Sequence, residues 1–221
     1  MKKIEAVIFD MDGVIIDSEM LWQQAENEIF SSLGVCVTDE LSEQTRSMTT
    51  SDVTKFWYDR FPWTNVALKE AERMVVSRVI ELIETEKCYI SGVKPFIERL
   101  KTCGYKIGLA TNSPSEVIPV VFGKLDIARL FDTVYSADFV KKGKPDPEIY
   151  YETAKKLNVE PANCIVIEDS YSGMLAAKAA GMTVVAFTNA NIELSFEIAD
   201  YTIDTFDEQL IDARGAVIGV S

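Results

Sequence analysis

The chain has 221 residues, and 48% of them are hydrophobic, so it can bury a substantial core and is not a disordered protein. Its net charge is −13 and its isoelectric point is near 4.5. This acidity argues against partners such as nucleic acid or an anionic membrane surface. No apolar stretch approaches the roughly 20 residues that a membrane span needs.

The chain has no histidine, and its cysteines are isolated. The four cysteines have no CxxC spacing, which favours reduced thiols over a disulfide frame or a zinc site. The first apolar run is cut by Asp10 and is too short for a signal peptide. We therefore expect a cytoplasmic protein. Without histidine, any chemistry must use carboxylates, hydroxyls, lysine or a hard metal ion.

The first predicted element is a buried strand over residues 6–9, which stops abruptly on Asp10. Asp12 follows two residues later, in a turn that contains Gly13. Apolar residues at helical spacing then predict a helix over 19–33, with Asp17 and Ser18 as its cap.

Only helical patterns follow between residues 39 and 87. Residues 51–60 and 66–86 each carry an apolar stripe, and no strand candidate occurs between 17 and 88. We interpret 17–87 as an all-helical domain inserted after the first strand.

From residue 88 onwards, predicted strands and helices alternate. Helices are predicted over 92–103, 115–125, 146–157 and 172–180, and strands over 106–110, 133–136, 164–167, 183–187 and 201–203. Alternation of this kind is typical of βαβ units. The predicted fold class is therefore α/β: a doubly wound, mostly parallel core of residues 1–16 plus 88–221. No element is predicted for 214–221.

Polar residues gather where these strands end. The first strand is followed by Asp10 and Asp12, the next by Thr111-Asn112-Ser113, and the strand over 164–167 by Glu168-Asp169; Lys144 precedes the 146–157 helix. The carboxyl ends of parallel strands share one edge, where α/β proteins bind ligands. Converging carboxylates suit Mg²⁺, while a hydroxyl and a lysine beside them suit a phosphate group.

Four motifs in this order carry a family resemblance. They are DMDG (10–13), TNS (111–113), KP (144–145) and EDSYSG (168–173). Together they resemble the haloacid dehalogenase superfamily, whose core is a doubly wound α/β fold. The carboxylate at Asp12 is similar to that of its phosphotransferases, since the dehalogenating branch lacks it.

The resemblance implies a role for each residue at the strand ends. Asp10 would be the nucleophile that forms an aspartyl-phosphate and also a Mg²⁺ ligand, and Asp12 would be the general acid and base. The backbone carbonyl of Asp12 would also ligate the metal. Thr111, Asn112 and Lys144 would bind the phosphoryl group, Asp169 would bind Mg²⁺ directly, and Glu168 would do so directly or through water. The helical insertion would be a cap over the site.

Simpler readings compete with these roles. A strand-end aspartate such as Asp10 can be a turn residue. Lys144 follows other lysines, and lysines in such a stretch can simply be exposed to solvent. Ser113, Ser170 and Ser172 are interpreted as helix caps. Four aromatic residues are expected in the core of the cap: Trp22, Phe56, Trp57 and Trp63. Glu19 and Trp22 lie close to the first motif, so a substrate contact by either stays a minority reading.

Within the superfamily, the chain resembles the β-phosphoglucomutase-like branch with a helical cap. The mutases of that branch use a cap histidine, which is absent here, and an arginine for the second phosphate where this chain has Thr49 in the stretch 46–49. The segments 17–22 and 57–63 are similar to those of bacterial phosphatases of the 2-deoxyglucose-6-phosphate type. We therefore expect a Mg²⁺-dependent phosphatase for hexose or polyol phosphates, active as a monomer or weak oligomer.

Three alternatives remain open at this stage. A phosphosugar mutase would use the same core residues. A receiver-like signalling module also places Asp, Thr and Lys around Mg²⁺, but it needs only about half this length. A non-catalytic protein that binds Mg²⁺ or phosphate on the same fold is the third.

Overall fold

The computed structural model describes residues 4–46, 48–191 and 196–206. Its strands are β1 (Ala6–Phe9), β2 (Lys106–Thr111), β3 (Thr133–Ser136), β4 (Cys164–Glu168), β5 (Thr183–Phe187) and β6 (Tyr201–Ile203). They form one parallel sheet in the order β3-β2-β1-β4-β5-β6. β1 lies at the centre, so its carboxyl end faces the switch point of the sheet. The segment 214–221 lies outside the described residues.

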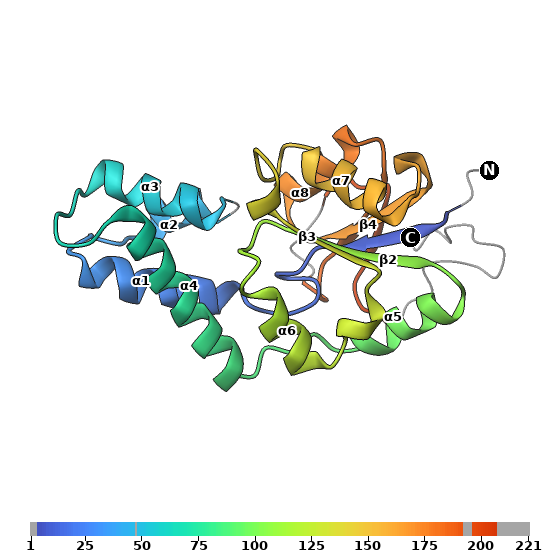
Figure 1. Cartoon of the computed structure of the whole chain (residues 1–221), viewed down its shortest axis with the longest axis horizontal. Coiled ribbons are helices and arrows are strands. Elements are labelled where there is room, and N and C mark those ends of the chain that lie inside the picture. Colours follow the sequence, from blue (N-terminus) through green and yellow to red (C-terminus); the bar gives the residue numbers. More distant parts are fainter. Residues whose placement is uncertain (1–3, 47, 192–195, 207–221) are drawn as a thin grey trace.

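Helices cover both faces of this sheet (Figure 1). Their bounds are α1 (Glu19–Ser32), α2 (Asp39–Thr45), α3 (Thr50–Arg60), α4 (Leu68–Thr85), α5 (Val93–Thr102), α6 (Ile118–Leu125), α7 (Glu148–Leu157) and α8 (Tyr171–Ala179). Short 3-10 turns occupy Ala128–Leu130, Ala137–Phe139 and Pro161–Asn163. In Figure 1, α5 and α6 lie on one side of the sheet, and α7 and α8 lie on the other. The predicted doubly wound architecture is confirmed.

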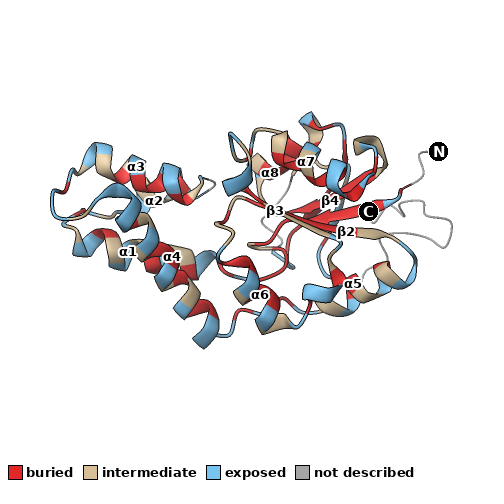
Figure 2. Cartoon of the chain, in the orientation of Figure 1, coloured by how far each residue is buried: buried red, intermediate tan, exposed pale blue. Residues whose placement is uncertain are grey.

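The central strand shows why its sequence is continuously apolar. Val7 and Phe9 pack into the cluster that includes α5 and α6, whereas Ala6 and Ile8 pack into the cluster beneath α7 and α8. All four side chains are fully buried, and Figure 2 shows the central strands in the red that marks buried residues. A strand covered on both faces must be apolar at every position, which explains the lack of alternation.

The helices α1 to α4 pack together at one end of the molecule (Figure 1). Trp57 is fully buried there, and its ring lies near those of Phe30 and Phe56. The chain enters and leaves this group at neighbouring points, because the Asp17 N–H donates to the Cys88 carbonyl at 3.0 Å. Within the described residues, no helix combines the length and the apolarity needed to cross a bilayer.

Helix boundaries depart from the sequence prediction at several ends. The largest departure is α6, which begins at Ile118 rather than at residue 115. The Ser115 backbone N–H and hydroxyl both donate to Asp138 at 2.8 Å, which holds that segment in a turn. Pro119 lies in the first helical turn, where its missing N–H costs nothing.

Candidate active site

Asp10 lies directly after β1, at the edge of the sheet where the order of the strands reverses. Its backbone N–H donates to the Ile167 carbonyl at 3.0 Å, which extends the β1–β4 ladder by one residue. The residue is 7% exposed, so its carboxylate is almost removed from water. Such a group needs charged or hydrogen-bonding partners.

Lys144 supplies the opposite charge to this carboxylate. Its Nζ atom lies 2.6 Å from Asp10 Oδ1 and 2.6 Å from Glu168 Oε1. The peptide bond between Lys144 and Pro145 is cis. The Asn112 side chain makes two hydrogen bonds to the backbone of the lysine. Asn112 Oδ1 accepts from the Lys144 N–H at 2.8 Å, and Asn112 Nδ2 donates to the Lys144 carbonyl at 3.3 Å. Two predicted site residues from distant segments are thus bound to each other.

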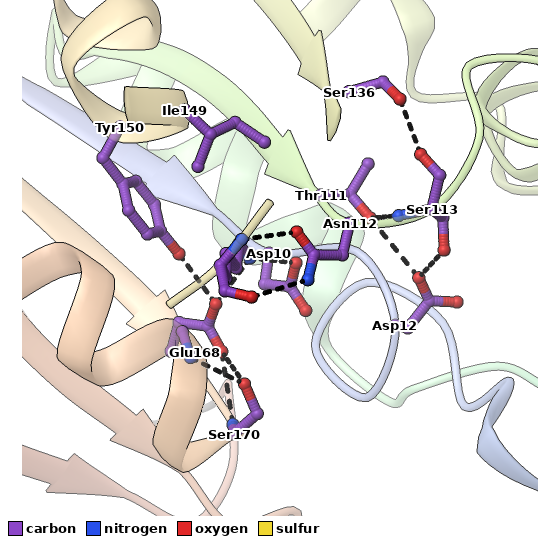
Figure 3. Close-up of polar contacts among 12 residues, drawn as sticks. Asp10, Asp12, Thr111, Asn112, Ser113, Ser136, Ile149, Tyr150, Glu168 and Ser170 are labelled. Atoms are coloured by element: carbon purple, nitrogen blue, oxygen red, sulfur yellow. Dashed lines mark hydrogen bonds and ion pairs between the residues drawn. The ribbon is translucent and has the colours of Figure 1, made fainter. Parts of the chain in front are cut away.

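Glu168 lies behind the lysine and is fully buried. Its Oε1 atom also accepts from the Tyr150 hydroxyl at 2.7 Å, and its Oε2 atom accepts from the Ser170 N–H and hydroxyl at 3.2 and 2.9 Å (Figure 3). Ser170 also caps α8, as predicted, by accepting from the Gly173 N–H at 3.1 Å. Each carboxylate oxygen of Glu168 therefore accepts two hydrogen bonds, and one of these bonds holds the Lys144 ammonium in place.

Two glycines make room for the acidic pair that ends β4. A Cβ atom at Gly173 would overlap the Glu168 carboxylate, and one at Gly13 would overlap the Asp169 carboxylate. Gly13 also has a φ of +77°, which side-chain-bearing residues rarely adopt. The glycines of the first and last motifs therefore have a steric explanation.

Three carboxylates of the site could share a cation. Asp10, Glu168 and Asp169 offer oxygens that all lie within 4.8 Å of one another. Burial raises the pKa of Asp10 to about 8, although Lys144 lowers it and Glu168 raises it further. Burial and the charges of Asp10 and Glu168 likewise raise the pKa of Asp169. A hard divalent cation would relieve this repulsion through oxygen ligands, so the donor set fits Mg²⁺.

Asp12 is surrounded by hydrogen-bond donors. Its Oδ1 atom accepts from the Ser18 hydroxyl at 2.5 Å and from the Trp22 indole N–H at 2.9 Å. Its Oδ2 atom accepts from the hydroxyls of Ser113 at 2.5 Å and Thr111 at 3.4 Å (Figure 3). The carboxylate therefore connects the strand edge to the start of α1.

These contacts correct two sequence interpretations. Ser18 occupies the N-cap position of α1, but its side chain makes no capping hydrogen bond and is turned toward Asp12 instead. Ser113 was expected to cap the following helix, but the N-cap of α6 is Val117, and the Ser113 hydroxyl donates to Asp12 instead. In both cases a nearby carboxylate competes for the hydroxyl, and a bond to a charged acceptor is the stronger one.

A cavity of about 750 Å³ lies between the strand edge and the helices α1 to α3. Its floor carries most of the predicted site residues: Asp10, Asp12, Thr111, Asn112, Lys144 and Asp169. Glu168 is the one predicted site residue that does not line it. Glu19 and Trp22 line its opposite wall, on α1. The volume suits a small organic ligand.

Comparison with known proteins places the chain in a family. Residues 7–187 match the family model of the haloacid dehalogenase-like hydrolases, and the chain belongs to that family. It is 36% identical to hexitol phosphatase B of Escherichia coli over 94% of this chain and 95% of the relative. It is 34% identical to a phosphorylated carbohydrates phosphatase of Thermotoga maritima over 81% and 82%.

The structure is also similar to those of solved members of this family. The solved β-phosphoglucomutase of Clostridium difficile superposes with a TM-score of 0.80 at 26% identity, covering 92% of each chain. The predicted resemblance to the haloacid dehalogenase superfamily and its β-phosphoglucomutase-like branch is confirmed. The receiver-domain alternative finds no support in these matches.

Sequence reasoning missed several residues of the site. Tyr150 had the signal of an aromatic residue in the helix after Lys144, but nothing in the sequence tied its hydroxyl to Glu168. Gly173 belongs to the EDSYSG motif, but the motif alone indicated no role for it. Trp22 was expected in the core of the cap, with a substrate contact as a minority reading, whereas its indole N–H is bonded to Asp12.

Proposed function

We propose that this protein is a Mg²⁺-dependent phosphatase that hydrolyses phosphate monoesters of hexoses or polyols through an aspartyl-phosphate. The observation that carries the proposal is the pairing of two aspartates with different surroundings at one strand end. Asp10 faces the Lys144 ammonium, whereas Asp12 faces only neutral hydrogen-bond donors. The named activities of the relatives support the same reading.

The different surroundings suit two different roles. Asp10 would attack phosphorus through a carboxylate oxygen, while the bond between phosphorus and the leaving oxygen breaks. Asp12 would give its proton to that oxygen, so that a neutral alcohol departs. In the second step Asp12 would take a proton from water, which attacks the phosphorus and releases Asp10 and inorganic phosphate. Thr111, the Asn112 backbone and Lys144 would hold the phosphoryl oxygens.

The metal would be held by carboxylates that surround Asp10. We assign Asp10, Asp169 and the backbone carbonyl of Asp12 as its ligands. Glu168 would act through water or through Lys144, because both its oxygens already accept two hydrogen bonds. When bound, Mg²⁺ would offset the repulsion between the Asp10 carboxylate and a phosphate dianion.

Residues 17–87 would form a cap domain on a core of 1–16 plus 88–221. The cavity between the two sets of residues would then close over the ester and exclude bulk water. We also infer a cytoplasmic location, consistent with four cysteines that are all unpaired, and a monomer or weak oligomer that needs only its small-molecule substrate.

Hydrolysis is favoured over the mutase reaction by the wall of the cavity. A mutase must hold a second phosphate, but Arg46, a cation on that wall, is already paired with Glu19 and Glu43. The chain also has no histidine to place beside Asp12, whose neighbour on α1 is Trp22. A dianion would therefore meet paired or negative side chains there.

The proposal is tested by phosphate release from a panel of sugar and polyol monophosphates, with Mg²⁺ and with EDTA. Asp10→Asn should lower kcat by about 10³-fold or more, whereas Asp59→Asn, on the exposed face of α3, should leave it unchanged. Loss of activity in EDTA and its return with Mg²⁺ are expected. An active Asp10→Asn enzyme, or no release from any ester, would contradict the proposal. Isomerisation driven by a sugar bisphosphate would favour the mutase.

A further inference from the structure

Three residues of α1 point into the cavity from successive turns. Glu19, Trp22 and Glu26 all line it, at a spacing that places them on one face of the helix. Trp22 is bonded to Asp12 at 2.9 Å, which places this face directly over the proposed site of reaction. Glu26 lies one turn further along the helix, about 6 Å from Trp22 along the helix axis. It is therefore placed to contact the alcohol part of a bound ester and not its phosphate.

Glu26 has no partner of its own within the described part of the chain. Glu19 is paired with Arg46, but neither a hydrogen bond nor an ion pair reaches Glu26. Burial raises the pKa of Glu26 to about 7, with no cation to offset it. The Glu26 carboxyl therefore faces the cavity with no cation or donor from the described residues bound to it, so a polar group of a ligand could bind there.

The surrounding wall shows what such a carboxyl could bind. Asp39 and Glu43 add two more acidic groups to the wall, against Arg46, whose charge is already shared by two carboxylates. A second phosphate or a carboxylate on the ligand would be repelled there. A hydroxyl can donate to Glu26 when the residue is ionised and can also accept from it when it is protonated.

We propose that Glu26 is a specificity residue that hydrogen-bonds a hydroxyl of the leaving alcohol and excludes esters that carry a second anionic group. This inference rests on the proposed phosphatase function and deepens it. The substrate class becomes the phosphate monoester of a neutral polyhydroxy alcohol. Bisphosphates and phosphorylated sugar acids would be poor substrates.

Two esters that differ at one carbon provide the test. Glucitol 6-phosphate and 6-phosphogluconate have the same chain of hydroxyls, but the far end is a CH₂OH group in the first and a carboxylate in the second. We expect the wild-type kcat/KM to favour glucitol 6-phosphate by about 100-fold. Glu26→Gln keeps the size of the side chain and should lower this preference by about 10-fold or more. Glu84→Gln, an exposed site on α4, should leave the preference unchanged.

p-Nitrophenyl phosphate separates the inference from the function on which it rests. This ester has no polyol, so its hydrolysis by Glu26→Gln shows that the variant is folded and that the phosphate chemistry is intact. An unchanged preference in a variant that still hydrolyses this ester would overturn the role of Glu26. So would wild-type enzyme that cleaves both sugar esters equally well. No hydrolysis of any of the three esters would instead remove the phosphatase function itself.

Discussion

Asp12 receives hydrogen bonds from side chains of separate parts of the chain. Thr111 and Ser113 come from the end of β2, and Ser18 and Trp22 come from the start of α1. Two donors on each oxygen fix the plane of the carboxylate, which a proton carrier requires in order to reach a leaving oxygen. Because half of these donors belong to the inserted helices, the position of α1 and that of the proposed acid are linked.

Replacing Trp22 by phenylalanine tests this link. The change keeps an apolar ring but removes the N–H that donates to Asp12. We expect kcat to fall by about 10-fold, since a hydrogen bond to a charged group contributes ~1.5–3 kcal/mol, with a smaller change in KM. Trp63→Phe is the matched control, because its indole N–H donates to the Val66 carbonyl within the helical group. Equal turnover in Trp22→Phe and wild type would show that Asp12 does not need this donor.

A second residue-scale prediction concerns Glu26 and pH. Its pKa is about 7 in the folded protein and near 4.5 when unfolded, so the folded state holds the proton more tightly between these values. Its effect on stability is therefore absent below about pH 4.5 and becomes increasingly unfavourable up to about pH 7. Glu26→Gln should be more stable than wild type at pH 8, by on the order of 2 kcal/mol, and similar at pH 4.5.

Urea unfolding of both proteins at the two pH values measures this difference. Glu84→Gln serves as the comparison, because Glu84 is exposed on α4. A stability difference between Glu26→Gln and wild type that is the same at both pH values would refute the proposed burial of the Glu26 charge.

At this scale the sequence predicted the floor of the cavity better than its walls. Asp10, Thr111 and Lys144 follow or approach strand ends, and parallel pairing brings such ends together whatever the surroundings. The partners of Asp12 and Glu168 depend on how α1 and α7 dock, which apolar periodicity does not specify. A pattern identifies the face of a helix that is buried, but it does not pair one hydroxyl with one carboxylate.

Among the elements, β4 and α8 approach each other closely at the site. Gly173 lies in α8, where alanine would ordinarily favour the helix by about 1 kcal/mol. Its Cβ would instead overlap the Glu168 carboxylate, which holds Lys144 and accepts from Tyr150. The geometry of the lysine therefore depends on a position that touches neither metal nor substrate.

We expect Gly173→Ala to lower kcat by about 100-fold, because displacing Glu168 by an ångström or so would displace Lys144 with it. Gly123→Ala in α6 is the control: a Cβ there has nothing within 4 Å, so this variant should be fully active and slightly more stable. Steady-state kinetics and thermal unfolding of the two variants give the answer. A fully active Gly173→Ala enzyme would mean that Glu168 is not held in place by this close contact.

Most strands and helices were predicted from the sequence, but several helix ends were not. Buried strands such as β1 and β4 are unmistakable, since in each of them four apolar residues are followed by an acid. The starts of helices were harder to predict, because side chains from elsewhere in the chain can bind the backbone N–H groups at a helix start. Asp138 holds Ser115 in a turn before α6, and this partner lies 23 residues further along the chain.

For the molecule as a whole, its charge opposes its proposed substrate. A net charge of −13 repels a phosphate dianion at long range, although Lys144 attracts it at the site. Raising the salt from about 10 to 150 mM shortens the screening length from about 30 to about 8 Å. With Mg²⁺ saturating, kcat/KM should therefore rise severalfold while kcat stays constant. A fall in kcat/KM over this range would mean that attraction at the site outweighs the overall repulsion.

The two crossings between the helical group and the sheet lie side by side. Ile16 forms an antiparallel bridge with Tyr89, and the Asp17 N–H donates to the Cys88 carbonyl at 3.0 Å. The chain therefore enters and leaves α1 to α4 at one place, although α4 also packs against α6 and the start of α1 is bonded to Asp12. A foreign helical segment joined at these crossings would leave the bond between Asp10 and Lys144 in place, but it would have to supply new donors for Asp12. Selectivity in this architecture can therefore be exchanged with the helices only if the new segment also keeps Asp12 in position.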